Sequence, residues 1–241
     1  MKVRVYQNKE QCGNAAAVLF AAQILKKANT VLGLATGSTP IPVYQALIRM
    51  YKEGTVDFSA CRSFNLDEYV NLPVDHACSY HTFMKEELFD HINVPANAIR
   101  VPDGNAEDPA SFCKAYDAEI AAAGGIDIQL LGIGRNGHIG FNEPSDHFVP
   151  GCHVVDLTAS TIAANARFFD SENDVPRQAI SLGIENILSA KSIVLLAFGK
   201  EKAEAVRAML QDPITPQVPA SILRTHPDVT LILDEDAASL L

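Results

Sequence analysis

The chain has 241 residues, of which 48% are hydrophobic and 20% are charged, so it can bury a large core and has an ordinary globular composition. Its net charge of −10 argues against nonspecific binding to nucleic acid or anionic membranes, although a small anionic substrate needs only a few local cations. The five cysteines include no Cys-x-x-Cys pair, which predicts neither a zinc site nor a disulfide framework. No signal peptide or membrane span is visible, and we expect a cytoplasmic protein.

Short apolar runs alternate with amphipathic stretches in the first half of the chain. The runs at 3–6, 31–35 and 61–66 predict strands, and the second is continuous, as expected of a parallel strand covered on both faces. Apolar residues at helical spacing predict helices at 15–25, 43–50, 80–88 and 107–122.

Residues Thr36–Pro40 form a short Gly/Ser/Thr loop between a predicted strand and a predicted helix. Free amides at a helix start, the helix dipole and two hydroxyl groups favour an anion such as phosphate at Gly37, Ser38 and Thr39. Alternatively, Ser38 or Thr39 only caps the helix, with Pro40 in its first turn. The loop by itself does not decide between these two interpretations.

An acidic pair, Asp67 and Glu68, directly follows the strand predicted at 61–66. Such a pair usually lies at a helix N-terminus or in solvent. The carboxyl ends of parallel strands meet at one edge of a sheet, so this pair is expected near the Gly37 loop. A carboxylate near a bound ligand is a candidate base, and Asp67 is that candidate.

The stretch Gly132–Pro144 follows the strand predicted at 126–131 and combines four glycines with His138 and Glu143. Turn glycines need no functional explanation, and a lone histidine near a strand end is usually structural. A histidine and a glutamate together in a glycine-rich turn indicate a ligand site, because open α/β sheets bind ligands at the carboxyl ends of their strands.

The alternation continues in the second half of the chain. We expect Phe148–Asp156 to be irregular and 158–169 to form an amphipathic helix that carries Arg167. Further strands are predicted at 179–182, 192–197 and 229–233, and further helices at 184–189, 198–210 and 220–223. Lys202 opposes the dipole at the start of its helix, so it either meets a local anion or is an ordinary surface lysine.

This order predicts a single α/β domain over residues 1–241, with a Rossmann-like open, mainly parallel sheet and helices on both faces. The loops at the carboxyl edge would bring acid/base groups and cations together. They suggest a phosphorylated small molecule that undergoes acid/base chemistry with no metal and no redox cofactor. The residues alone do not identify the substrate.

Four sequence blocks occur in one order along the chain: Ala35–Pro40, Phe64–Tyr69, Gly132–Pro144 and Ala166–Phe169. Together they closely resemble the glucosamine-6-phosphate deaminases (glucosamine-6-phosphate isomerases), over essentially the whole chain. The Gly-His-Ile-Gly-Phe-Asn-Glu-Pro sequence is the most specific part. The resemblance implies conversion of glucosamine 6-phosphate and water to fructose 6-phosphate and ammonia, in amino-sugar catabolism, without a cofactor.

The resemblance also implies roles for individual residues. His138 would shuttle the ring-opening proton between O1 and O5 of the sugar, and Glu143 would orient the imidazole and stabilise its charged form. Asp67 would remove the C2 proton and return a proton at C1. The implied phosphate-binding residues are Gly37, Ser38, Thr39, Arg167 and Lys202.

Asn136 occupies a ring-opening position at which many relatives carry aspartate. It can still hydrogen-bond the sugar but brings no charge, so His138 is expected to be less basic than in such a relative.

A mobile helical lid at about 144–174, which brings Arg167 onto the phosphate, is a further implication of the resemblance. Some relatives are hexamers activated by N-acetylglucosamine 6-phosphate, with basic residues in the segment that here reads Gly151–Val155. This chain lacks those residues and a longer C-terminus, so we expect little or no such activation. We expect a monomer or small homo-oligomer whose partner is a sugar phosphate, not nucleic acid or a membrane.

Two alternatives stay open beside the deaminase. A 6-phosphogluconolactonase shares the sheet and a similar glycine-rich His turn, but lactone hydrolysis needs neither the Phe141–Pro144 continuation nor a base such as Asp67. A non-catalytic sugar-phosphate sensor would be expected to lose the acid/base residues or to add a DNA-binding segment.

Overall fold

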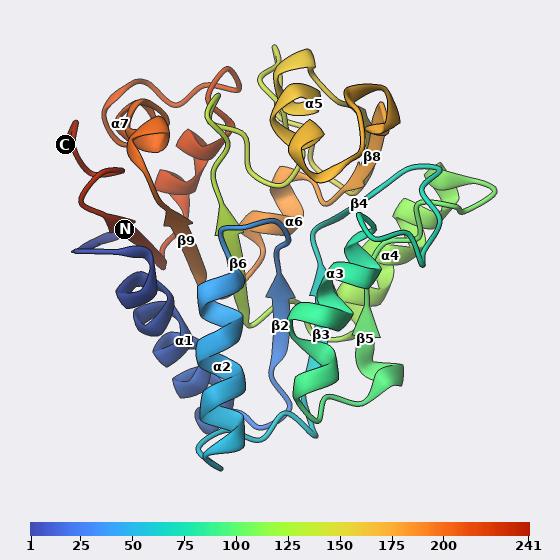
Figure 1. Cartoon of the computed structure of the whole chain (residues 1–241), viewed down its shortest axis with the longest axis vertical. Helices are drawn as coiled ribbons and strands as arrows, with labels where there is room; N and C mark the ends of the chain where they lie inside the picture. Colours follow the sequence, from blue (N-terminus) through green and yellow to red (C-terminus); the bar gives the residue numbers. More distant parts are fainter.

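Ten strands alternate with seven α-helices in the computed structural model, which describes residues 1–241 and is coloured along the sequence in Figure 1. The strands are β1 (Lys2–Tyr6), β2 (Val31–Leu34), β3 (Arg62–Asn65), β4 (Asp67–Tyr69), β5 (Ile99–Arg100), β6 (Ile128–Gly132), β7 (His153–Asp156), β8 (Gln178–Ser181), β9 (Ile193–Ala197) and β10 (Val229–Asp234). The α-helices are α1 (Lys9–Lys26), α2 (Ile41–Lys52), α3 (Tyr80–Glu87), α4 (Pro109–Ala122), α5 (Ala159–Asn165), α6 (Ile184–Leu188) and α7 (Ala203–Gln211). None of these helices has the length and apolar character that crossing a bilayer requires.

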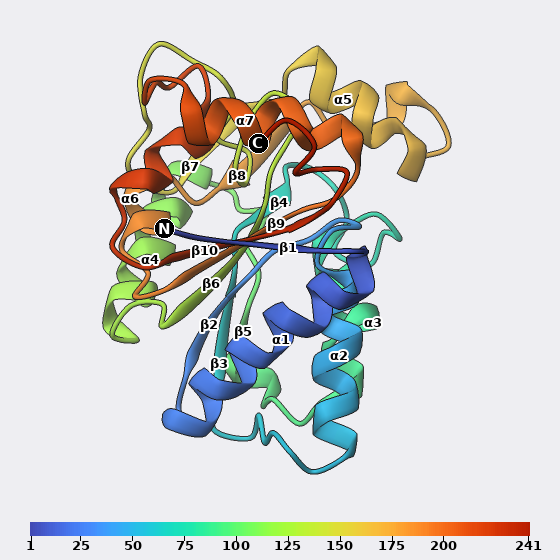
Figure 2. The same ribbon diagram turned by 90° about the vertical axis from the view of Figure 1, so that its left-hand side faces the viewer.

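Seven strands form one sheet in the order β1-β10-β9-β6-β2-β3-β5, in which every neighbouring pair is parallel. Helices α1, α2 and α3 lie on one side of this sheet, and α4 and α6 lie on the other (Figure 2). Strands β2 and β9 are buried along their whole length, because a parallel sheet covered on both faces has no solvent side. The predicted Rossmann-like fold with an open, mainly parallel sheet is confirmed.

The strand order reverses between β2 and β6. From β2 the chain proceeds through β3 to β5, whereas from β6 it proceeds through β9 to β10 on the opposite side. The two strands are direct neighbours, with Leu32 opposite Ile128 and Gly33 opposite Gln129. Their loops diverge at the carboxyl edge of the sheet, which is where open α/β sheets have room for a ligand.

A second sheet, with three antiparallel strands in the order β4-β8-β7, differs from the prediction. Phe148–Asp156 is not irregular throughout, because its last four residues form β7. The acidic pair after β3 lies neither at a helix start nor in solvent but within β4. The strand predicted at 179–182 is present as β8 and belongs to this antiparallel sheet. Each of these strands pairs with a distant segment, which local periodicity does not reveal.

A small apolar cluster lies between the second sheet and α5, apart from the main core of 50 buried residues. Its seven buried members are Tyr69, Leu72, Phe141, Leu157, Ile162, Val175 and Ala179. The helix predicted at 158–169 is shorter than expected, because α5 ends at Asn165 and residues Ala166–Phe168 form a 3₁₀ turn. This segment therefore packs on a cluster of its own, near the carboxyl edge of the large sheet.

Asp127 fastens β2 to β6 at the opposite edge of the sheet. Its buried carboxylate accepts hydrogen bonds from the Val31 amide at 2.8 Å, Lys27 Nζ at 2.5 Å and Lys191 Nζ at 2.6 Å. Burial acts to raise the pKa of Asp127, but the hydrogen bonds from Lys191, Lys27 and Val31 outweigh it and hold the pKa below its usual range.

We predict that Asp127→Asn lowers the free energy of unfolding by about 2 kcal/mol at pH 7, because a buried charged acceptor of three donors is lost while both lysines stay partly solvated. A depressed carboxyl pKa stabilises the fold above the unfolded pKa, and that contribution disappears as pH falls through the folded pKa. Urea unfolding should therefore separate the two proteins at pH 7 and bring them together as pH falls through the lowered pKa of Asp127.

Glu235→Gln, at an exposed acidic position, is the matched control and should change the unfolding free energy by less than about 0.5 kcal/mol. Equal stability of wild type and Asp127→Asn at pH 7 would contradict the role given to this carboxylate.

Candidate active site

The loop between β2 and α2 leaves its amides and hydroxyls available. Gly37 has a φ of +88°, which bends the chain sharply before α2. Helix α2 has Pro40 at its N-cap position and no side-chain cap, so neither Ser38 nor Thr39 serves as the cap that the sequence left open. The start of this helix therefore keeps free N–H groups and the positive end of its dipole.

Three cationic side chains converge on this loop. Arg167 Nη2 donates to Ser38 Oγ at 3.5 Å, and Lys202 Nζ donates to the Ile133 carbonyl at 2.7 Å. Burial lowers the pKa of Lys202, and the nearby positive charges of Arg135 and Arg167 lower it further. None of the three cations pairs with a carboxylate within 4.0 Å. Unpaired cations around a free helix N-terminus form a site for a dianion.

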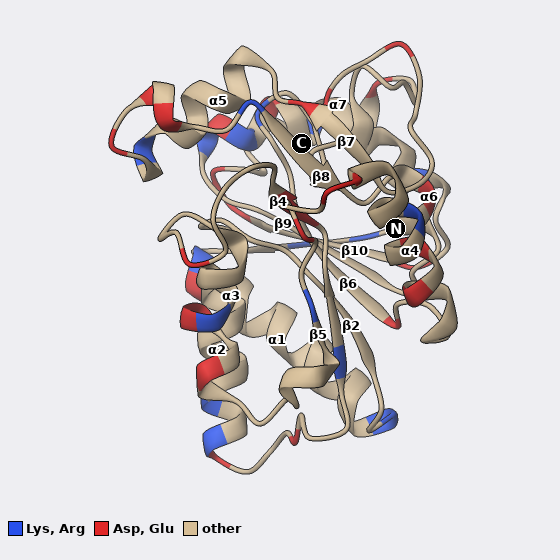
Figure 3. Ribbon diagram, turned by 90° about the vertical axis from the view of Figure 1, so that its right-hand side faces the viewer, with Lys and Arg blue, Asp and Glu red and all other residues tan.

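Asp67 lies on β4 beneath this loop, with only 7% of its surface exposed. Thr36 Oγ1 donates to Asp67 Oδ1 at 3.4 Å. Burial, and then the neighbouring charge of Glu68, raise the pKa of Asp67 to about 7. In Figure 3, β4 is an acidic strand near the centre of the molecule, below the basic residues beside α5. The carboxylate is thus suited to take up and release a proton near neutral pH.

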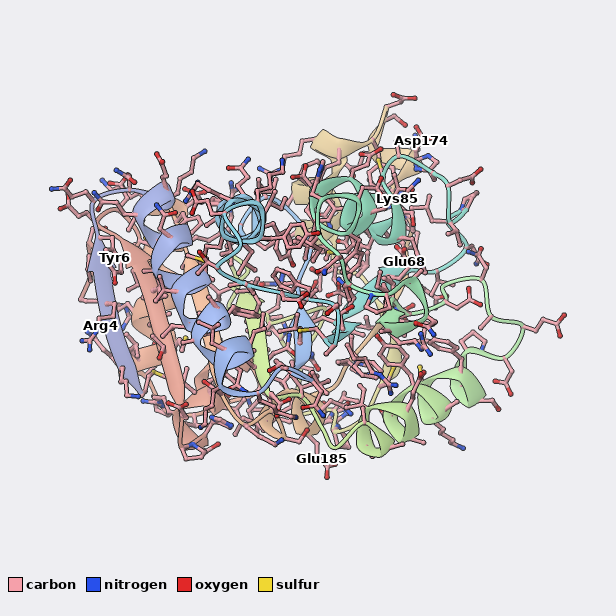
Figure 4. All side chains as sticks on the ribbon, turned by 90° about the horizontal axis from the view of Figure 1, so that it is seen from below. Arg4, Tyr6, Glu68, Lys85, Asp174 and Glu185 are labelled. Carbon is pink, nitrogen blue, oxygen red and sulfur yellow. The ribbon has the colours of Figure 1, made fainter.

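Glu68 is buried on the opposite side of β4, next to α3 (Figure 4). Its Oε1 accepts hydrogen bonds from the Tyr69 and Tyr80 amides at 2.8 and 3.1 Å. Its Oε2 accepts hydrogen bonds from the Ser79 hydroxyl and the His81 amide at 2.8 and 3.1 Å. Glu68 therefore accepts hydrogen bonds from free donors at the start of α3, although Ser79 lies 11 residues after it in the sequence. It also places a carboxyl group beside Asp67.

His138 lies in the turn after β6 and packs on Gly134. A Cβ at Gly134 would come within 2.3 Å of the imidazole, so only glycine leaves room for the ring. His138 Nδ1 lies 3.5 Å from Glu143 Oε2, and this buried nitrogen has no hydrogen-bond partner of good geometry. Catalytic hydrogen bonds are often long before substrate binds.

Glu143 is held from two sides. From the turn, Asn136 Nδ2 donates to Oε2 at 2.8 Å. From α5, the Thr161 hydroxyl donates to Oε1 through a short hydrogen bond. Burial acts to raise the pKa of Glu143, but the nearby His138, with hydrogen bonds from Thr161 and Asn136, holds the pKa below its usual range. Glu143 is therefore an ionised partner for the imidazole.

The turn and Asp67 face one another across a narrow gap. Gly140 has a φ of +57°, and a Cβ placed there would lie 3.6 Å from Asp67 Oδ2 and 3.1 Å from Ser181 Oγ. A Cβ on Gly132 would likewise lie 3.6 Å from Thr39. The loop between β2 and α2, Asp67 and the His138 turn therefore line one region. The three cations lie at one end of it, and Asp67 and His138 lie at the other.

The structure brings all of the residues expected from the sequence to this region: Gly37, Ser38, Thr39, Asp67, Asn136, His138, Glu143, Arg167 and Lys202. Three residues that contribute to it were not expected: Glu68, Arg135 and Thr161. Of these three, only Arg135 could have been suspected from the sequence, because it is a cationic residue in the glycine-rich turn that follows a predicted strand. The contacts of Glu68 and Thr161 come from segments distant in sequence.

A cavity of about 320 Å³ lies behind Glu143, away from this region. Residues of the turn, of β7 and of the start of α5 line it, among them Glu143, His153, Asp156 and Thr158. It contains no lysine or arginine, and neither Asp67 nor His138 lines it. The cavity therefore borders Glu143 but is separate from Asp67 and His138.

Comparison with known proteins identifies the family to which the chain belongs. A model described as glucosamine-6-phosphate isomerases/6-phosphogluconolactonase matches residues 7–232. The chain belongs to this family.

Members of the family differ in how closely they match. The glucosamine-6-phosphate deaminase of Halothermothrix orenii is 52% identical over 241 residues, which is 100% of both chains. A solved structure of a monomeric glucosamine-6-phosphate deaminase covers 100% of both chains with a TM-score of 0.98 and 46% identity. The 6-phosphogluconolactonase of Trypanosoma brucei has a TM-score of 0.77 and 21% identity over 100% of this chain and 98% of its own, a likeness that shows the fold alone.

We predict that Glu68→Gln lowers the pKa of Asp67 from about 7 toward its usual range, because a neighbouring negative charge is removed. The unfolding free energy should fall by about 2 kcal/mol, since a glutamine presents an NH₂ group to two of the four donors. Carbon-13 NMR titration of the aspartate carboxyls measures the first effect, with Asp67→Asn used to assign the resonance. A titration of Asp67 that is the same in both proteins would contradict the charge effect.

Proposed function

We propose that this chain is a glucosamine-6-phosphate deaminase, which converts glucosamine 6-phosphate and water to fructose 6-phosphate and ammonia. The observation that carries the proposal is the opposition of Asp67 to the His138–Glu143 pair across one gap, with three cations at its end. An aldose–ketose isomerisation needs a base at C2, a ring-opening acid/base and a phosphate grip. The deaminase relatives at 46 to 52% identity support the same reaction.

The phosphate binds at the start of α2. The amides and hydroxyls of the Gly37, Ser38 and Thr39 loop donate hydrogen bonds to its oxygens, and Arg167 and Lys202 supply charge. Arg135 adds a third positive charge at the same end. Burial, with a smaller contribution from the charges of Arg135 and Arg167, lowers the pKa of Lys202, and a dianion there would favour its charged form. Binding at this end places the sugar ring toward Asp67 and the turn.

Ring opening takes place at His138. The imidazole carries a proton from the O1 hydroxyl to the ring oxygen O5, which leaves an aldehyde at C1. Glu143 stabilises the imidazolium while it holds the proton. Asn136 contributes by fixing the same carboxylate oxygen that faces His138 Nδ1.

Isomerisation and loss of nitrogen follow at Asp67. The carboxylate removes the C2 proton while a proton of the substrate's ammonium group moves to O1, which gives an enolamine. Asp67 then returns its proton to C1, which gives a protonated imine at C2. Water adds to C2, the C2–N bond breaks, and ammonia leaves with fructose 6-phosphate as the second product. A pKa of about 7 suits Asp67 to both proton transfers, because it lets the group take up and release a proton near neutral pH.

The segment 144–174 acts as a lid over the phosphate. It carries Arg167, whose guanidinium stacks 4.6 Å above the Phe168 ring and reaches Ser38 from outside. From Val155 to Phe169 the lid packs on the small apolar cluster, whereas Phe148 and Cys152 near its start pack against the main core. Few contacts with the main core suit a segment that closes over a ligand.

Two rival functions make different demands on the site. A 6-phosphogluconolactonase would use the phosphate grip and the turn but has no use for a buried base at C2, and the lactonase relatives match at 21% identity. A non-catalytic sensor would not need the raised pKa of Asp67 or the ionised Glu143. The deaminase uses all of these features.

Ammonia and fructose 6-phosphate released from glucosamine 6-phosphate should fall by more than about a hundredfold in Asp67→Asn, because an amide cannot act as the base. The variant should also be more stable than wild type at pH 8. A carboxyl group whose folded pKa is raised destabilises the folded state once it ionises, and the amide does not ionise. Coupled ammonia assays and thermal melts at pH 8 measure the two effects.

The same assays include 6-phosphogluconolactone as a second substrate. Hydrolysis of the lactone without ammonia release by wild type would replace the deaminase with the lactonase. Full ammonia release by Asp67→Asn would refute the mechanism while leaving the substrate assignment intact.

Asn136→Asp should shift the acid limb of the kcat profile to higher pH. The substitution replaces an N–H donor to Glu143 by a negative charge, which raises the pKa of Glu143 and of His138 together. Rate measurements with glucosamine 6-phosphate from pH 5.5 to 9 test this, with Asn136→Ala separating the lost donor from the added charge. An unchanged profile in Asn136→Asp would exclude Asn136 from the proton relay.

A further inference from the structure

Thr161 is a buried hydroxyl on the lid that contacts the ring-opening carboxylate. It lies on α5 with 5% of its surface exposed, and its Oγ1 donates to Glu143 Oε1. The other oxygen of Glu143 accepts from Asn136 and faces His138. Thr161 thus supplies the one hydrogen bond that reaches this carboxylate from the lid.

The hydroxyl proton of Thr161 is directed at Glu143 by its own helix. Thr158 caps α5, and its Oγ1 accepts the Thr161 amide at 3.3 Å. The same Thr158 Oγ1 donates to Thr161 Oγ1 at 3.2 Å. Because the Thr161 oxygen already accepts a proton from Thr158, its own proton is free for the carboxylate.

We propose that Thr161 is a positioning residue for ring opening: from the lid it holds Glu143 in the orientation that serves His138. This inference rests on the deaminase function proposed above. Thr161 does not touch the sugar, so it acts through Glu143 and not on the substrate.

The surroundings of Glu143 explain why the hydrogen bond from Thr161 matters for its orientation. Its side chain is 6% exposed, so Oε1 has little access to water that could replace the lost donor. Behind Glu143 lies the 320 Å³ cavity, into which an unrestrained carboxylate can turn. The titratable groups that face Glu143 are His138 from the turn and, across the cavity, His147, His153 and Asp156. Thr161 keeps the carboxylate on the His138 side.

The same lid segment also carries the phosphate contact. Arg167 follows α5 in the 3₁₀ turn Ala166–Phe168, six residues from Thr161, or roughly 9 Å along a helix. Ile162, next to Thr161, is buried in the small apolar cluster with Phe141, two residues before Glu143. A phosphate gripped by Arg167 therefore fixes the position of α5, and α5 fixes the carboxylate at the other end of the sugar. Closure of the lid over the phosphate would therefore also position Glu143 for ring opening.

Thr161→Val tests the proposal, because it removes the hydroxyl but keeps the β-branched shape. We expect kcat with glucosamine 6-phosphate to fall about tenfold, as for the loss of one hydrogen bond to a charged group. The acid limb of the kcat profile should move to higher pH, since Glu143 loses a donor to its ionised form. KM should stay unchanged, and Thr161→Ser should restore both kcat and the profile. Thr225→Val, the same substitution at an exposed threonine outside the lid, should match wild type.

The possible outcomes separate this inference from the proposed function. A raised KM with an unchanged pH profile in Thr161→Val would show that Thr161 only supports the lid, and it would overturn the inference. So would a kcat and profile equal to wild type. A wild type that releases no ammonia would overturn the proposed function and the role of Thr161 with it. Reduced kcat and a shifted profile, reversed in Thr161→Ser, support the proposal.

Discussion

The parallel pairing of β2 with β6 is the constraint on which the site depends. The order of the sheet reverses at this pair, so the loops that leave the two strands turn away from each other at the same edge. One loop offers amides and hydroxyls at the start of α2, and the other carries His138 and the residues that hold it. Glycine is needed at Gly134, where the imidazole lies on the backbone. The proposed anion site and the proposed acid/base groups are thereby placed side by side at one edge of the sheet.

The site concentrates carboxylates in a place that stability alone would not favour. Asp67 and Glu68 are adjacent and buried; Glu68 accepts four hydrogen bonds, whereas Asp67 accepts one, from Thr36. The second charge raises the pKa of Asp67, and burial raises it further. The donors to Glu68 come from the start of α3, so the same contacts that hold a helix in place also set the proton affinity of the proposed base.

Much of the fold and most of the proposed site could be predicted from the sequence, because the apolar runs of the parallel strands and the glycine-rich turns are local patterns. Strands β1, β2, β9 and β10 lie within one residue of their predicted bounds. Strand β7 could not be predicted, since its four residues form a strand only through pairing with β8. The contacts of Thr161 and Glu68 were invisible for the same reason, because each joins segments that are brought together only by the fold.

Because the two apolar clusters are separate, the parts of the molecule that pack on them differ in stability. The main core holds 50 buried residues and the cluster under the lid holds seven, so opening the smaller one exposes far less apolar surface. Mild heat or denaturant would open the segment that carries Arg167 and Thr161 while the parallel sheet remains folded. We therefore expect inactivation and global unfolding to be two separate transitions, and a protease that cuts in the opened lid would leave a folded sheet without the proposed phosphate-binding arginine and without the Thr161 contact on Glu143.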